Sequence, residues 1–125
     1  SALMHQFEKL KLPYNVNIFS LLAAEVFIDR EKELRWWIEK LIADREVLKE
    51  RLETMSGLKV YPSAGNFLLV ESLQRPPKDV QREMASRGIL IRDVSSYPGL
   101  GRGLRITVGT PGENEACITA LKEVL

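Results

Sequence analysis

The chain has 125 residues, a formal net charge of +1, one cysteine and one histidine. Its length predicts one modest globular domain, and its near-zero charge argues against nucleic acid or an anionic membrane as a partner. The single cysteine, Cys117, excludes an internal disulfide and favours a reducing compartment, so we expect a cytoplasmic protein. We expect no metal site, because the only histidine, His5, lies in the expected tail and cannot complete a His/Cys cluster.

The N-terminal part of the chain predicts a tail, a turn and helices. We expect residues 1–11 to be a tail whose first residues are a cloning remnant, and one domain to occupy residues 12–125. Residues 12–17 predict a turn, and Asn17 or Ser20 is expected to cap a helix that starts near Ser20. The apolar stretch 18–28 is too short to span a bilayer.

Residues 29–55 give the clearest helical pattern, with an apolar stripe on one face that ends before Gly57. The stripe consists of Leu34, Ile38, Leu41, Arg45, Leu48, Leu52 and Met55. Arg45 is its one charged member. We expect its aliphatic stem to pack while its guanidinium reaches solvent or a carboxylate.

The rest of the chain alternates strands and helices. Strand-like runs at 58–61 and 66–71 flank a turn at 62–65, and a helix opens at Pro76 and ends at Gly88. A capping box begins the last helix, which is expected to bury Ala116 or Cys117, Ala120, Leu121 and Val124. The order predicts an α+β fold: a small, mostly antiparallel sheet with helices over one face.

Two predicted strands, 88–93 and 104–110, each place one arginine beside a glycine-rich turn. If they pair as a hairpin, Arg92 and Arg105 meet at one end of the sheet, where two guanidinium groups suit a phosphate or carboxylate. Alternation with aliphatic neighbours puts Arg105 on the less apolar face. Taken singly, each arginine has a simpler explanation as a solvated or salt-bridged residue, and Asp93 is a competing partner.

Other chemistry is weakly supported. Arg102 is either a third anion contact or, more simply, an unanchored exposed residue between glycines. No histidine accompanies Ser20, Ser63 or Ser95, so a nucleophilic triad is not expected. We assign no catalytic residue to this chain.

Several segments together resemble the C-terminal small domain of histidinol-phosphate aminotransferases, over about Lys11 to Leu125. The matching segments are Leu12-Pro13-Tyr14-Asn15-Val16-Asn17, Asp44-Arg45-Glu46-Val47-Leu48, Pro62-Ser63-Ala64-Gly65-Asn66-Phe67, Gly88-Ile89 with Ile91-Arg92, and Leu104-Arg105-Ile106-Thr107-Val108-Gly109-Thr110 with Glu113-Asn114. The last two motifs are the most specific.

The resemblance implies a homodimeric, fold-type I, pyridoxal-phosphate-dependent enzyme of histidine biosynthesis. Such enzymes move an amino group between histidinol phosphate and 2-oxoglutarate. The resemblance further implies that Arg105 grips the anionic end of the substrate and that Arg92 lies near its phosphate. Tyr14, Asn15 and Asn17 are candidate pocket-lining residues on the same basis.

The resemblance also implies that a cofactor-linking lysine belongs to a large domain that this sequence lacks, so we expect this chain alone to be inactive. An apolar patch around Tyr14, Val16, Phe19 and Leu22 is then expected to cause self-association. Three alternatives stay open: a domain of a threonine-phosphate decarboxylase-like enzyme, a free-standing anion-binding module, and a dimerisation piece that uses the 29–55 helix.

Overall fold

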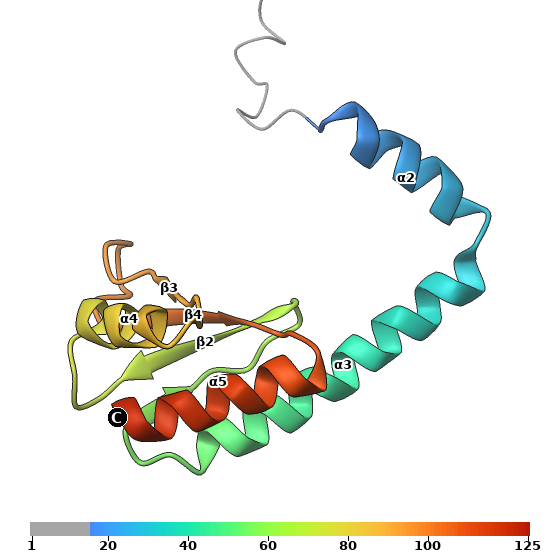
Figure 1. Ribbon diagram of the computed structural model, residues 1–125. Coiled ribbons are helices and arrows are strands. Elements are labelled where there is room, and N and C mark those ends of the chain that lie inside the picture. Colours follow the sequence, from blue (N-terminus) through green and yellow to red (C-terminus); the bar gives the residue numbers. More distant parts are fainter. Residues whose placement is uncertain (1–15) are drawn as a thin grey trace, which may run out of the picture. The chain divides into compact units, whose positions relative to one another are not determined.

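The computed structural model describes residues 16–125. The elements are α2 (Ile18–Ile28), α3 (Glu31–Glu53), β1 (Leu58–Val60), β2 (Phe67–Ser72), α4 (Pro77–Ser86), β3 (Arg92–Asp93), β4 (Gly103–Thr107) and α5 (Pro111–Val124) (Figure 1). The chain divides within α3 into two compact units, the first ending at Trp36 and the second comprising Trp37–Leu125. Within the described part, none of the helices combines the length and apolarity needed to cross a membrane.

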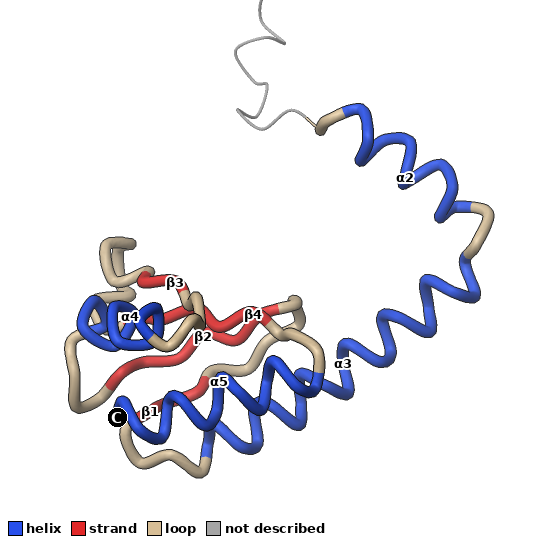
Figure 2. Tube along the Cα trace, viewed as in Figure 1, coloured by secondary structure: helices blue, strands red, loops and turns tan. Residues whose placement is uncertain are grey.

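The four strands form one antiparallel sheet in the order β1-β2-β4-β3 (Figure 2). The chain therefore does not lay its strands down in spatial order: β4 pairs with β2, and the short β3 is placed on the outer edge. This arrangement confirms the predicted α+β class and the predicted hairpin pairing of the two arginine-bearing segments.

One face of the sheet is buried beneath α3, α4 and α5. Strands β2 and β4 direct alternate aliphatic side chains to this face, because successive residues of a strand point to opposite sides. The core combines Leu48, Leu52, Leu68, Val70, Val80, Met84, Leu104, Ile106, Ile118 and Leu121, among others. The intervening residues, including Phe67, Leu69, Arg105 and Thr107, therefore belong to the opposite, open face of the sheet.

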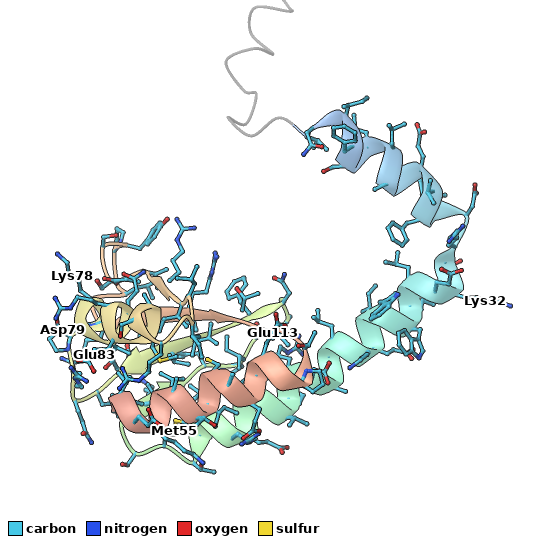
Figure 3. The ribbon with its side chains drawn as sticks, viewed as in Figure 1. Lys32, Met55, Lys78, Asp79, Glu83 and Glu113 are labelled. Carbon is cyan, nitrogen blue, oxygen red and sulfur yellow. The ribbon has the colours of Figure 1, made fainter. Side chains whose placement is uncertain are left out.

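Helix α5 begins with the predicted capping box. The Glu113 carboxylate accepts a hydrogen bond from the Thr110 backbone N–H at 2.7 Å, and the Thr110 hydroxyl accepts one from the Glu113 N–H at 3.3 Å (Figure 3). Between the two predicted alternatives, Cys117 is buried and Ala116 is exposed. Burial raises the pKa of the Cys117 thiol to about 11, so this cysteine stays a protonated core residue.

Several predicted elements differ in extent from the observed ones; the ladder of β4, for example, covers Gly103–Thr107 rather than 104–110. The ladder of β3 covers only Arg92–Asp93 rather than the whole segment 88–93, because the preceding residues terminate α4: the Ile89 N–H bonds the Met84 carbonyl at 3.0 Å. The predicted helix 29–55 begins at Glu31 and ends at Glu53. Its stripe is buried only in the C-terminal half of α3, and Leu34 and Ile38 are exposed.

Arg45 behaves as the sequence predicts for the stripe's charged member. Its side chain is 10% exposed, and its Nη2 contacts the Glu46 carboxylate at 2.9 Å. Its Nη1 donates to the Gly65 carbonyl at 3.0 Å, which ties α3 to the turn between β1 and β2.

Helix α2 buries none of its residues. Asn17 is its N-cap, and the Asn17 side chain accepts a hydrogen bond from the Ser20 N–H at 2.9 Å. Phe19 is 80% exposed, and Val16 and Leu22 are also exposed. Three of the four residues of the expected apolar patch are thus on the surface of this chain, and the fourth, Tyr14, lies outside the described residues.

We expect the chain to self-associate through this apolar surface, because water is released when such side chains are covered. Sedimentation velocity over a concentration series should show a rising sedimentation coefficient, and Phe19→Asp should suppress the rise. Lys32→Ala changes the net charge equally without removing a large apolar group, so it is the matched control. A protein that stays monomeric at high concentration would contradict the prediction.

Candidate functional site

Arg92 and Arg105 are direct cross-strand partners in the β3–β4 ladder. Residues opposite each other in an antiparallel pair project to the same face, with Cβ atoms about 4.5–5.5 Å apart. The hairpin therefore brings two positive charges together on the open face of the sheet. Like charges in this arrangement destabilise a sheet unless something negative lies between them.

No acidic residue of the described chain neutralises this pair. Among residues 16–125, neither guanidinium forms an ion pair, although most other arginines there do. Asp93, the expected competitor, follows Arg92 in the strand and points to the other face. Its carboxylate instead accepts a hydrogen bond from the Ser95 N–H at 2.8 Å.

Both arginines line one open cavity of about 250 Å³. Its other lining residues are Phe67, Leu69, Val94, Tyr97 and Leu100. The cavity thus combines two cations with an otherwise apolar and aromatic wall, apart from the Tyr97 hydroxyl. A low-polarity wall strengthens the attraction between a guanidinium and a bound anion, since water screens the charges less.

The connection between β3 and β4 forms one side of this cavity. Consecutive backbone hydrogen bonds, from Tyr97 to Val94 and from Leu100 to Tyr97, fold it into turns. Gly99 adopts a φ of 81°, a conformation that favours glycine. A Cβ at Gly103 would lie 3.0 Å from the Leu100 carbonyl oxygen, so glycine permits the close return of the loop to the sheet.

Arg102 is anchored rather than free, which corrects the sequence-based expectation for this exposed residue. Its Nε donates to the Ser72 carbonyl at 2.5 Å. A further contact of 3.5 Å joins its Nη2 to the Arg75 carbonyl. Its hydrogen bonds therefore hold the start of β4 to the end of β2, and it does not line the cavity.

The Arg105 side chain contacts an aromatic ring, and its buried Nε has no described hydrogen-bond partner. Its Nε is shielded from solvent and has no hydrogen-bond partner among the described residues. Its guanidinium carbon lies 5.4 Å from the centroid of the Phe67 ring, within the range of a cation–π interaction. Arg105 is half-buried, whereas Arg92, on the edge strand, is exposed.

Sequence reasoning identified the two arginines but missed the rest of the cavity lining. Leu69 is directly opposite Arg105 in the β2–β4 ladder, and Phe67 lies two residues along the same face. The alternation of side chains along β2 places Phe67 and Leu69 on one face of the strand. It assigns them to the cavity only once the pairing of β2 with β4 is known. Tyr97 and Leu100 come from the loop, where no periodicity exists.

The other candidate pocket residues are Tyr14, Asn15 and Asn17. Tyr14 and Asn15 lie outside the described residues, and Asn17 serves as the N-cap of α2. Among residues 16–125, no group of three or more His, Cys, Asp or Glu side chains is arranged to hold a metal ion. The arrangement around Arg92 and Arg105 is suited to binding and orienting an anion, and it supplies no evident nucleophile or acid–base pair.

Comparison with known proteins identifies the chain's relatives. Residues 1–121 match the model of the family described as aminotransferase class I and II. The chain belongs to this family. It is 41% identical over 117 residues to histidinol-phosphate aminotransferase 1 of Carboxydothermus hydrogenoformans, covering 94% of this chain and 32% of the relative. It is 39% identical over 119 residues to the histidinol-phosphate aminotransferase of Roseiflexus castenholzii, covering 93% of this chain and 32% of the relative.

A solved structure shares the fold of this aminotransferase-family chain. The L-threonine-O-3-phosphate decarboxylase from Porphyromonas gingivalis superimposes with a TM-score of 0.73 at 26% identity, over 86% of this chain and 34% of the decarboxylase. The chain therefore spans about a third of the length of the relatives that it matches.

The family implies pyridoxal phosphate, which needs a lysine amine for its covalent link. Within residues 16–125 the lysines are Lys32, Lys40, Lys49, Lys59, Lys78 and Lys122, and none of them lines the arginine cavity. Lys40, Lys49 and Lys59 are each paired with a carboxylate. The described residues therefore do not form a covalent cofactor site beside Arg92 and Arg105.

Replacing one arginine of the pair by an acid should stabilise the folded protein. Arg92→Glu converts a like-charge cross-strand pair into an opposite-charge pair, for an expected gain of about 0.2–1 kcal/mol in the free energy of unfolding at low ionic strength. Urea denaturation measures the change, and added salt should shrink it. Arg92→Gln is the control, because it removes the repulsion only. Lower stability of Arg92→Glu than of Arg92→Gln would contradict the observed register.

Proposed function

We propose that this chain supplies the C-terminal small domain, residues 12–125, of a pyridoxal-phosphate-dependent aminotransferase. The proposed reaction moves an amino group between histidinol phosphate and 2-oxoglutarate. In it, Arg92 and Arg105 bind the anionic group of the substrate. The observation that carries this proposal is their direct cross-strand pairing beside one cavity, with no described carboxylate to neutralise them.

One clamp of this kind suits both substrates. A phosphate monoester carries up to two negative charges, and a dicarboxylate presents a carboxylate of similar hydrogen-bonding geometry. The guanidinium group is planar, permanently charged and able to donate two parallel hydrogen bonds to either. Binding at this distal end would hold the amine of the substrate in a fixed orientation toward the reacting centre, which accelerates the reaction without any bond chemistry by the arginines.

The amino-group chemistry is supplied by the cofactor, for which the described residues offer no covalent site beside the arginine cavity. We therefore propose that residues outside this domain hold pyridoxal phosphate and that the chain alone does not turn over substrate. The enzyme is proposed to act as a homodimer in the cytoplasm, in histidine biosynthesis. The proposed reaction is supported by the named histidinol-phosphate aminotransferase relatives.

A second candidate substrate is supported by the structural similarity to a threonine-phosphate decarboxylase. Both candidate substrates carry a phosphate monoester, so the arginine pair alone does not separate them. They differ in the body of the molecule, which would contact the apolar and aromatic wall of the cavity rather than the cations.

Histidinol phosphate should bind this chain weakly, and Arg105→Ala should abolish the binding. Hydrogen bonds to charged groups contribute about 1.5–3 kcal/mol, so the loss should be roughly tenfold or more in affinity. Isothermal titration calorimetry at low ionic strength measures it, with threonine phosphate titrated in parallel to separate the two candidate substrates.

Arg82→Ala is the matched control for this titration, because Arg82 is an exposed arginine paired with Asp79 outside the cavity. It should leave the affinity unchanged. Equal affinity of Arg105→Ala and the unaltered chain would exclude the proposed clamp.

Pyridoxal phosphate added to the chain alone should produce no stoichiometric long-wavelength absorbance band, and the chain should show no transamination. The physical reason is that no described lysine lies beside the proposed substrate cavity. Borohydride trapping followed by peptide mass spectrometry checks the result. Stoichiometric labelling of one lysine would overturn the proposal that this chain is inactive.

A further inference from the structure

The guanidinium of Arg105 has a different kind of partner from those of the other buried and half-buried arginines. Arg45 pairs with Glu46, Arg51 with Glu115 and Arg75 with Glu83, so each of these is held by a carboxylate that also neutralises it. Arg105 has no such partner among the described residues. Its guanidinium instead lies over the Phe67 ring, with 5.4 Å between the guanidinium carbon and the ring centroid.

The sheet register explains why Phe67 and Arg105 meet. Leu69 is the direct partner of Arg105, and Phe67 is the direct partner of Thr107. Phe67 is therefore the diagonal neighbour of Arg105 on the same face, a separation that long and aromatic side chains bridge. A long arginine side chain on β4 can thus reach across β2 to the ring.

The Phe67 residue is itself fixed by the turn that precedes β2. The Ser63 hydroxyl donates to the Phe67 carbonyl at 2.6 Å and accepts a hydrogen bond from the Gly65 N–H at 3.0 Å. Gly65 lies against the ring, since a Cβ there would be 3.5 Å from the Phe67 Cε1 atom. Arg45 donates to the Gly65 carbonyl at 3.0 Å, so the turn is anchored to α3.

This chain of contacts has a chemical consequence. An aromatic face attracts a cation through its quadrupole but contributes no net negative charge. It can therefore orient the Arg105 guanidinium while leaving its full charge for a ligand, which a carboxylate would not do. The buried Nε without an acceptor fits the same picture, because the side chain is held by packing rather than by hydrogen bonds.

We propose that Phe67 is a positioning residue for Arg105, holding its guanidinium at the cavity in an un-neutralised state for an incoming phosphate or carboxylate. The inference rests on the proposed function, in which Arg105 binds the anion. Phe67 would act through Arg105 rather than contact the anion itself. The turn at 62–66 and Arg45 would in turn hold Phe67 in place.

The test is the affinity of Phe67 variants for histidinol phosphate, measured by isothermal titration calorimetry at low ionic strength. Phe67→Leu should weaken binding about three- to tenfold, the loss expected from removing a partly desolvated cation–π contact. Phe67→Tyr keeps an aromatic face and should restore affinity to within about twofold.

A second measurement keeps the shape of the ring while reversing its electrostatics. A pentafluorophenyl ring at position 67 should weaken binding like leucine does, since fluorination inverts the quadrupole. The matched control is Tyr61→Leu, which removes an aromatic ring that directly follows β1 and does not line the cavity. The Lys59 Nζ lies 4.8 Å from the centroid of this ring. Tyr61→Leu should leave the affinity unchanged.

The outcomes separate this inference from the function beneath it. In the first outcome, the unaltered chain binds histidinol phosphate, Arg105→Ala abolishes the binding, and both Phe67 variants bind normally. Phe67 is then not a positioning residue, although the proposed binding by Arg105 still holds. In the second outcome, Phe67→Leu binds weakly but the variant with the fluorinated ring binds normally. This result would also overturn the inference, because it would show that Phe67 acts through packing alone. If the unaltered chain does not bind, the clamp and this inference fail together.

Discussion

Two guanidinium groups placed directly opposite each other in an antiparallel ladder are the feature on which the proposed site depends. This register of β3 against β4 is not set by the arginines, which repel each other. It is set by the opposite face, where Leu104 and Ile106 are buried under the helices. A slip of one residue would move these side chains to the open face and Arg105 into the core, so the apolar core fixes the position of the charges.

The same structure holds its buried and half-buried arginines in two ways. On the helices and their connections, carboxylates pair with the guanidinium groups and cancel their charge, as Glu83 does for Arg75. At the cavity, packing and an aromatic ring hold Arg105 instead. The first arrangement stabilises the fold, whereas the second keeps a cation available, at the cost of the repulsion between the two arginines.

The sequence predicts this fold well wherever the signal is local. The alternation of residues 104–108, the capping box at Thr110 and Glu113, and the buried Arg45 all depend on neighbours within one element, and all are found in the structure. Phe67 and Tyr97 could not be assigned to the site in this way. Their places in the cavity lining follow from the pairing of β2 with β4 and from the path of the loop, neither of which a local sequence pattern reveals.

The short edge strand has a consequence for how the proposed clamp would work. Arg105 belongs to β4, which has a hydrogen-bonded strand on each side, whereas Arg92 belongs to a two-residue strand with a single neighbour. Backbone restrained on one side by so few hydrogen bonds is freer to adjust. In the proposed site, Arg105 would therefore be held in a fixed position, whereas Arg92 could move. Such a pair could adapt to tetrahedral and planar anions of different size without disturbing the core.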